Sequence, residues 1–205
     1  MGTTKFILIR HGETVWNKKH KMQGQTDIPL SKVGIKQAKQ LGIHLKDIHF
    51  DILYSSPLKR ALQTAKQIHQ FHAHIPFLTH KNLKERSFGD LEGIIYEDLV
   101  LIHPRMAFDK SWDYPYFQPP KGECLIDVQE RVKLLLKEIL VHYEGKTIAI
   151  VSHGVTLRVI IQILVGLPFS SAEALKTDNT SCAFIEFDPK TGGHIHFINY
   201  MKHLE

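Results

Sequence analysis

The sequence predicts a three-layer α/β/α sandwich whose central sheet is mainly parallel and carries an antiparallel edge strand. Short apolar runs of strand length alternate along the chain with longer amphipathic runs of helix length, as in sheets covered by helices on both faces. Two of the apolar runs end in a histidine followed by a glycine, at 11–12 and 153–154. Near the C-terminus, a turn-rich linker at 188–193 joins two further strand-like runs and indicates a hairpin.

The first half of the chain is predicted to alternate between strand and helix. Apolar runs of strand length lie at 5–10, 51–54 and 75–78. A helix opens at Ser31, a good N-cap residue, and runs to about residue 46. Its predicted buried stripe consists of Val33, Ala38, Leu41 and Leu45. Ser56 and Pro57 open the next helix, which runs to about residue 71, because proline is favoured at the first helical position.

The second half begins with a less regular region and then returns to the alternation. The region 84–122 contains a short helix near 96–102 and an aromatic, proline-rich loop. The longest helix is predicted over 125–143, with one apolar face made of Val128, Val132, Leu135 and Ile139. A purely apolar strand, a helix and the two hairpin strands then follow at 147–151, 155–165, 182–187 and 194–200.

The chain has the size and composition of one globular domain. It holds 205 residues, of which 23% are charged and 43% hydrophobic, and no linker rich in proline, glycine or serine divides it. We therefore expect a single domain over 1–205, with a lid-like insertion around 84–122. The N-terminal apolar run is too short for a signal peptide or a membrane span, and the two cysteines form no CxxC pattern. These features favour a cytoplasmic protein without a membrane partner.

A formal net charge of +5 is compatible with a nucleic-acid binder or with an enzyme for anionic substrates. The lysines and arginines are scattered through the helical runs, and no dense basic cluster or nucleic-acid-binding module is recognisable. We therefore expect a small anionic substrate and no nucleic-acid partner. The sequence leaves the choice between a monomer and a dimer open.

Two strands are predicted to end in the same way. One ends in Arg10, His11 and Gly12, and the other in His153 and Gly154. The carboxyl ends of parallel strands lie at one edge of a sheet, where ligands bind in such folds, so the two imidazoles are expected to face a common pocket. A lone histidine at a strand end is usually structural, but two in matched contexts indicate a site. The helix that starts after His153 adds backbone N–H groups that suit an anion.

A third strand end repeats the pattern at 55–61. Arg60 lies about one turn into the helix that follows, where its side chain can reach back over the helix start. Together with Arg10 it can hold the equatorial oxygens of a phosphoryl group, a bidentate task that suits guanidinium better than ammonium. Arg60 taken alone would be interpreted as a surface arginine.

Several segments stand together in the order and spacing of a known family. They are Arg10-His11-Gly12-Glu13-Thr14, Asn17, the segments 55–61 and 83–93, and Ser152-His153-Gly154. These segments span most of the chain, and together they resemble the histidine phosphatase superfamily, which includes the cofactor-dependent phosphoglycerate mutases.

The resemblance implies a role for each residue of the predicted site. His11 would be the phosphorylated nucleophile, and Glu85 would be the proton donor. The phosphoryl group would lie in a pocket made by Arg10, Asn17, Gln23, Arg60, His153 and Gly154. The substrate would be a small-molecule phosphoester. We expect no metal and no cofactor, because two arginines and one imidazolium can supply the positive charge that phosphoryl transfer requires.

The physical chemistry of phosphohistidine formation fits these roles. A histidine nucleophile needs one unprotonated ring nitrogen, with the N–H of the other nitrogen held by an acceptor. Neighbouring cations would lower the pKa of His11 and keep it neutral, whereas a bound dianion would favour a protonated His153. Glu85 would donate a proton to the leaving oxygen and then activate the water that hydrolyses the phosphohistidine.

The same pocket suits either a phosphatase or a mutase. The mutases that this chain resembles usually carry paired arginines after the Glu85 motif, but 104–117 contains no such pair and is rich in aromatic residues. An apolar lid would suit varied alkyl or aryl phosphates, so we predict a phosphomonoester hydrolase of broad specificity. A cofactor-dependent phosphoglycerate mutase is the alternative. A non-catalytic phosphate-binding module is a third hypothesis, which the presence of a proton donor disfavours.

Two other features have simpler interpretations. His69, His72 and His74 gather near a predicted helix end with no acidic ligand beside them, so we expect a solvated helix end rather than a metal site. Cys124 stands where the family has the serine of a Gly-Glu-Ser motif, and a thiol is a weaker donor than a hydroxyl.

Overall fold

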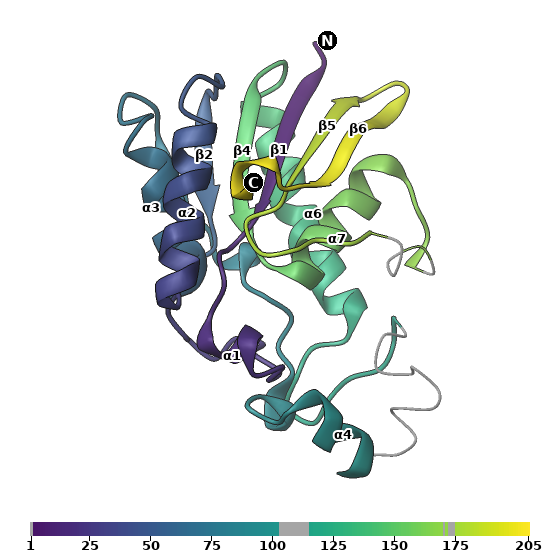
Figure 1. Ribbon diagram of the computed structural model, residues 1–205. Coiled ribbons are helices and arrows are strands. Elements are labelled where there is room, and N and C mark those ends of the chain that lie inside the picture. The colour runs from purple at the N-terminus through teal and green to yellow at the C-terminus, as the bar shows by residue number, and fades with distance from the viewer. Residues whose placement is uncertain (1, 103–114, 170, 172–174) are drawn as a thin grey trace.

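The computed structural model describes residues 2–102, 115–169, 171 and 175–205, and Figure 1 shows a sheet flanked by helices. Within these residues the sheet has six strands in the order β3-β2-β4-β1-β5-β6. Their bounds are Thr4–Arg10 (β1), Ile52–Ser55 (β2), Phe77–Thr79 (β3), Thr147–Ser152 (β4), Cys182–Asp188 (β5) and Gly192–Tyr200 (β6). The first four pair in parallel, β5 pairs antiparallel with β1, and β6 pairs antiparallel with β5. The predicted fold class is confirmed.

Helices cover both faces of the sheet. Their bounds are Val15–Lys18 (α1), Lys32–His44 (α2), Lys59–His69 (α3), Tyr96–Ile102 (α4), Leu125–His142 (α6) and Gly154–Val165 (α7). Single 3-10 turns lie at Lys81–Leu83, Gly89–Leu91 and Lys202–Leu204. The pair α2 and α3 packs on one face and the pair α6 and α7 on the other (Figure 1). Among the described residues, no helix is long and apolar enough to cross a membrane.

The strands are apolar on both faces because each face has its own core. In β1, Phe6 and Leu8 point into the core under α6 and α7, whereas Ile7 and Ile9 point into the core under α2 and α3. This alternation follows from the two-residue period of a strand. Burial on both sides fixes the register of β1 against β4, where Arg10 lies opposite Ser152. The polar residues that follow these two strands are thereby brought to the same edge.

Two details of the predicted helices are wrong. Val33 is 53% exposed, because the buried face of α2 starts one residue later and consists of Gly34, Ala38 and Leu41, followed by Leu45 at the C-cap. The helix expected at Pro57 starts instead at Lys59 and ends at His69. Leu58, the N-cap residue, is extended, and the Ser56 hydroxyl lies 2.8 Å from His153 Nε2 in the site described below. The predicted apolar face of the long helix is confirmed, since all four of its residues are buried.

The residues after β1 pack tightly against α2 through two glycines. A Cβ added to Gly12 would lie 2.7 Å from the carbonyl oxygen of Gly34. A Cβ added to Gly34 would lie 2.0 Å from the carbonyl oxygen of Glu13. The absence of both side chains therefore lets the backbone that carries His11 lie directly on the helix.

We expect Gly34→Ala to lower the free energy of unfolding by about 2 kcal/mol, because backbone must move to admit the methyl group. Glycine-to-alanine changes inside helices ordinarily stabilise by up to about 1 kcal/mol, so the expected sign is reversed here. Urea unfolding measures the effect. Lys36→Ala in the exposed part of the same helix is the control, with a change within about 0.5 kcal/mol. A stabilised Gly34→Ala variant would contradict the close packing.

The predicted lid-like insertion around 84–122 is described only in part. Most of its aromatic segment, at 103–114, lies outside the described residues. Of the remainder, Phe117 packs against a small apolar cluster of Phe88, Leu91 and Leu99, whereas Tyr116 is 76% exposed. The lid and the single domain over 1–205 stay predictions.

Candidate active site

The carboxyl ends of β1, β2 and β4 bring the chemistry-bearing residues together. The rings of His11 and His153 lie 5.1 Å apart between centroids, and both are almost completely buried. Arg60, at the start of α3, is only 1% exposed and contacts His153 directly. Residues far apart in the sequence therefore form one compact buried cluster. It lies at the carboxyl edge of the sheet, where the sequence predicted that the two imidazoles would meet.

His11 presents one basic ring nitrogen. Its Nδ1 donates to the carbonyl oxygen of Gly12 at 2.7 Å, and since that oxygen can only accept, Nδ1 carries the hydrogen and Nε2 does not. Burial lowers the pKa of His11 well below its usual value, and the charges of Arg60 and Arg10 lower it further. The Gly12 hydrogen bond acts in the opposite direction with a smaller effect. His11 is therefore neutral at neutral pH, with a free lone pair on Nε2.

His153 is held as the opposite tautomer. Arg60 Nε donates to His153 Nδ1 at 3.1 Å, so the ring hydrogen is on Nε2, which lies 2.8 Å from the Ser56 hydroxyl. Burial lowers the pKa of His153 well below its usual value, with the charge of Arg60 as the next cause. His153 is thus neutral in the free protein. A protonated His153 requires that Arg60 give up this bond, as a bound anion would favour.

Arg60 is fixed by two backbone carbonyls of one loop. Its Nη2 donates to Gly24 O at 2.7 Å and its Nη1 donates to Thr26 O at 2.9 Å. Burial lowers the pKa of Arg60 to about 10, which leaves the guanidinium charged at neutral pH. Each terminal nitrogen carries two hydrogens, so the guanidinium keeps N–H groups for a ligand after these bonds are made.

Arg10 is half-buried, and its buried Nε is an unsatisfied donor. Its Nη1 donates to the carbonyl oxygen of Thr177, but its Nε has no hydrogen-bond partner within the described part of the chain. A buried N–H without a partner is costly, and an anion would supply the missing acceptor. Gly154 lies beside it, since an added Cβ there would be 3.7 Å from Arg10 Nε. The start of α7 and Arg10 therefore form one wall of the site.

Asn17 and Gln23 are oriented by the same hydroxyl. Thr14 Oγ1 lies 3.1 Å from Asn17 Oδ1 and 2.9 Å from Gln23 Oε1. The backbone N–H of Thr14 also donates to Asn17 Oδ1, at 3.0 Å. With both amide oxygens occupied, each side chain has its NH₂ group left to donate to a ligand.

Glu85 takes the anion-binding position at the start of α7. Its carboxylate accepts the backbone N–H groups of Val155 and Thr156 at 3.2 and 3.1 Å, and also the Thr156 hydroxyl at 3.1 Å. The sequence interpretation assigned these helix N–H groups to a bound anion from outside. That interpretation is wrong for Val155 and Thr156, because the protein's own carboxylate satisfies their N–H groups and is thereby fixed where its charge acts on Arg10 and Arg60.

Sequence reasoning missed several residues that hold the site. Asn179 Nδ2 donates to the carbonyl oxygen of His11 at 2.9 Å, and the backbone N–H of Thr180 donates to Arg10 O at 3.1 Å. Thr180 adopts the left-handed region, with φ of 60°. Neither residue belongs to a recognisable sequence pattern. Both lie in the turn before β5, and the pairing of β5 with β1 is what brings this turn beside Arg10 and His11.

The candidate metal ligands are engaged elsewhere. Within the described ranges, no group of three or more His, Cys, Asp or Glu residues is placed to hold a metal ion. His69 Nε2 lies 3.2 Å from Ile75 O and His72 Nε2 lies 3.0 Å from Leu45 O, so both rings bond to backbone. The expected solvated helix end is wrong for His72, which is buried. Cys124, at the N-cap of α6, is bonded through its backbone N–H to Asp127 Oδ2 at 2.8 Å.

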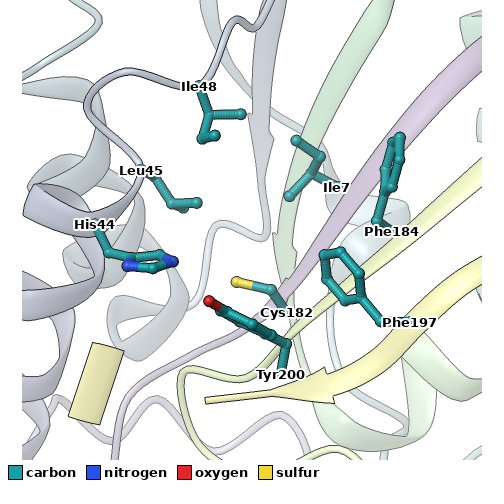
Figure 2. Close-up of a pocket in the computed structure, with 8 residues that line it drawn as sticks. All are labelled: Ile7, His44, Leu45, Ile48, Cys182, Phe184, Phe197 and Tyr200. Atoms are coloured by element: carbon teal, nitrogen blue, oxygen red, sulfur yellow. The ribbon is translucent and has the colours of Figure 1, made fainter. Parts of the chain in front are cut away.

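A separate cavity of about 420 Å³ lies between α2 and strands β1, β5 and β6. Figure 2 shows its lining residues, which are Ile7, His44, Leu45, Ile48, Cys182, Phe184, Phe197 and Tyr200. The walls are apolar, and none of the residues predicted for phosphate binding contributes to them. This cavity is thus distinct from the strand-end cluster.

The fold and the cluster together define a class of protein: a three-layer α/β sandwich with two neutral imidazoles and two arginines, one buried and one half-buried, at the carboxyl edge of its sheet. Residues 6–200 match the model of the histidine phosphatase superfamily (branch 1), and the chain belongs to this family.

Relatives and solved structures agree with this assignment. The chain is 35% identical to the uncharacterized phosphatase PhoE of Bacillus subtilis, over 80% of this chain and 78% of that protein. It is 33% identical to a 2,3-bisphosphoglycerate-dependent phosphoglycerate mutase of Cytophaga hutchinsonii, over 77% and 76% of the two chains. The structure of Bacillus stearothermophilus YhfR superposes with a TM-score of 0.88 at 33% identity, covering 98% of this chain and 100% of that one.

Proposed function

We propose that this protein is a metal-independent phosphomonoester hydrolase that acts through a phosphohistidine on small organic phosphates, with broad specificity. The observation that carries the proposal is the state of His11. Its Nδ1 is held by Gly12, its Nε2 is unprotonated, and its pKa is lowered by burial and by two arginines. A neutral imidazole among guanidinium groups combines a nucleophile with the charges that attract a phosphate.

Binding of the phosphoryl group would use the donors left free in the cluster. Arg10 Nε lacks a partner and Arg60 retains terminal N–H groups, so both can hold phosphoryl oxygens. The amide groups of Asn17 and Gln23, the backbone at Gly154 and the imidazole of His153 complete the proposed pocket. The dianion would draw Arg60 away from His153 and thereby favour protonation of that ring.

The proposed reaction has two steps. First, His11 Nε2 attacks phosphorus, the bond to the ester oxygen breaks, and a protonated Glu85 gives its proton to the leaving alcohol. Second, water attacks the phosphohistidine, Glu85 takes a proton from it, and the P–N bond breaks to release phosphate and restore neutral His11. The backbone N–H groups of Arg86, Val155 and Thr156, which bond to the Glu85 carboxylate, fix its position in both steps.

The composition of the segment 104–117 favours hydrolysis over mutase activity. The segment 104–117 holds no pair of arginines, which would bind the second acidic group of a phosphoglycerate. Incubation with 3-phosphoglycerate, with and without 2,3-bisphosphoglycerate, tests this choice. We expect release of inorganic phosphate to exceed isomerisation in both mixtures. Isomerisation that exceeds hydrolysis and depends on the bisphosphate would establish the mutase instead, and binding without turnover of any phosphoester would establish a binding module.

The pH dependence of kcat/KM reports the protonation of the free enzyme. A histidine with an ordinary pKa of about 6.5 would leave only about one tenth of the molecules neutral at pH 5.5. Since the pKa of His11 is lowered well below that value, the neutral form persists as the pH falls. We expect kcat/KM at pH 5.5 to retain at least about half of its value at pH 7, once the ionisation of the substrate is divided out. A tenfold loss centred near 6.5 would contradict a neutral His11.

A further inference from the structure

A second carboxylate, Glu92, connects two loops beside the catalytic cluster. Its Oε1 accepts the backbone N–H of Gln25 at 2.9 Å and that of Phe88 at 3.1 Å. Its Oε2 accepts the backbone N–H of Thr26 at 2.8 Å and the hydroxyl of the same residue. A single side chain thereby satisfies three backbone donors from segments more than sixty residues apart in the chain.

One of these loops is the loop that holds Arg60. The N–H groups of Gln25 and Thr26 that bond to Glu92 lie between the carbonyls of Gly24 and Thr26 that accept from the Arg60 guanidinium. Each N–H and the carbonyl before it belong to one planar peptide unit, so fixing the N–H fixes the direction of that carbonyl. Through the unit of Gly24 and Gln25, Glu92 Oε1 therefore orients the acceptor of Arg60 Nη2.

Close contact at Gly24 strengthens this coupling. Gly24 has φ of +49°, and an added Cβ would lie 2.0 Å from Glu92 Oε1. The loop therefore bends in a left-handed conformation directly onto the carboxylate, which a side chain would prevent. The negative charge of Glu92 also acts on Arg60, because it raises the pKa of the guanidinium against the larger lowering by burial.

We propose that Glu92 is a positioning residue that acts through Arg60: by holding the peptide units of 24–26 it aims the guanidinium at the phosphoryl group and at His153. This inference rests on the proposed function, because it assigns Arg60 to phosphate binding. Glu92 does not touch substrate itself.

If Glu92 only supported the loop, its substitution would have the same effect whether or not Arg60 is present. If Glu92 acts through Arg60, the effect on phosphate binding must disappear when Arg60 is absent, and a double-substitution cycle distinguishes these two cases. The probe is orthovanadate, whose dissociation constant is measured by calorimetry for the full chain, for Glu92→Gln, for Arg60→Ala and for the double variant. Glutamine keeps the size of the side chain but turns an NH₂ group towards backbone N–H donors. Glu97→Gln is the matched control, since this exposed carboxylate on α4 pairs with the exposed ring of His20 and not with the peptide units of 24–26.

We expect Glu92→Gln to weaken vanadate binding about tenfold in the natural background and less than about twofold when Arg60 is already absent. Equal losses in the two backgrounds, or none in the first, would overturn the coupling. If Glu92→Gln folds poorly, Thr26→Val removes one donor to the same carboxylate, and its binding loss must likewise disappear without Arg60. Failure of the unsubstituted chain to bind vanadate would overturn the phosphate pocket, whereas binding that both variants leave unchanged would overturn only the role of Glu92.

Discussion

Replacing His11 with alanine is expected to abolish hydrolysis of p-nitrophenyl phosphate, with a fall in kcat of about 10⁴-fold or more. The reason is chemical: no other group in the described cluster combines a free unprotonated nitrogen with a pKa that burial and the charges of both arginines lower. His153 does not replace it, because its Nδ1 accepts from Arg60 and its Nε2 carries the hydrogen. The measurement is a turnover assay together with an alkaline quench of enzyme that is turning over a ³²P-labelled phosphoester.

The trapped label distinguishes this mechanism from direct attack by water. Label on the natural protein is expected to be acid-labile and stable to base, as for a phosphoramidate, and to be absent in His11→Ala. His142→Ala is the control, because this histidine is exposed at the end of α6, and both its turnover and its labelling are expected to match the natural protein. Turnover that survives in His11→Ala, or label that moves to another residue, would exclude His11 as the nucleophile.

Replacing Glu85 with glutamine has the second largest expected effect, a fall in kcat of about 10² to 10⁴-fold, the usual range for loss of general acid–base catalysis. Glutamine keeps one acceptor oxygen for the N–H groups of Val155 and Thr156 but cannot deliver or accept the proton. The loss should depend on the leaving group. An alkyl phosphate, whose alkoxide is a poor leaving group, should suffer more than p-nitrophenyl phosphate.

The second step offers an independent measurement for this variant. With p-nitrophenyl phosphate the first step needs little proton donation, so phosphohistidine should accumulate and appear as a burst of nitrophenol. Thermal unfolding of Glu85→Gln must be measured alongside, since the NH₂ group faces backbone donors. Glu130→Gln, at an exposed position on α6 that pairs with Lys133, is the control and should show neither effect. Equal losses for both substrates with no burst would argue that Glu85 is only structural.

Much of the fold follows from local periodicity. All six strands lie within two residues of their expected bounds, and the short helix 96–102 has the expected bounds. The errors arise where a neighbour matters. The buried face of α2 is set by Gly34, whose missing side chain permits the contact with Glu13, so the larger Val33 is left exposed. The start of α3 is displaced because Ser56 bonds to His153 rather than serving as the helix N-cap.

The cluster could be located from sequence for a similarly local reason. His11 and His153 each follow a buried strand, and parallel pairing of β1 with β4 brings their ends together. The state of each ring could not be predicted in this way. Tautomers depend on the groups that face each nitrogen, and those groups are the carbonyl of Gly12 on one ring and Arg60 on the other.

The sequence by itself determined the fold class, the order of strands and helices, and the placement of Arg10, His11 and His153 at strand ends, because these depend on short-range hydrophobic periodicity. Only the tertiary structure decided which partner each polar group takes. The first N–H groups of α7 bond to Glu85. The carbonyls that accept from Arg60 belong to the loop 24–26, which bonds to Glu92. The physical reason is that buried donors and acceptors must be satisfied by whichever backbone lies beside them, and that neighbour is set by the packing of distant segments.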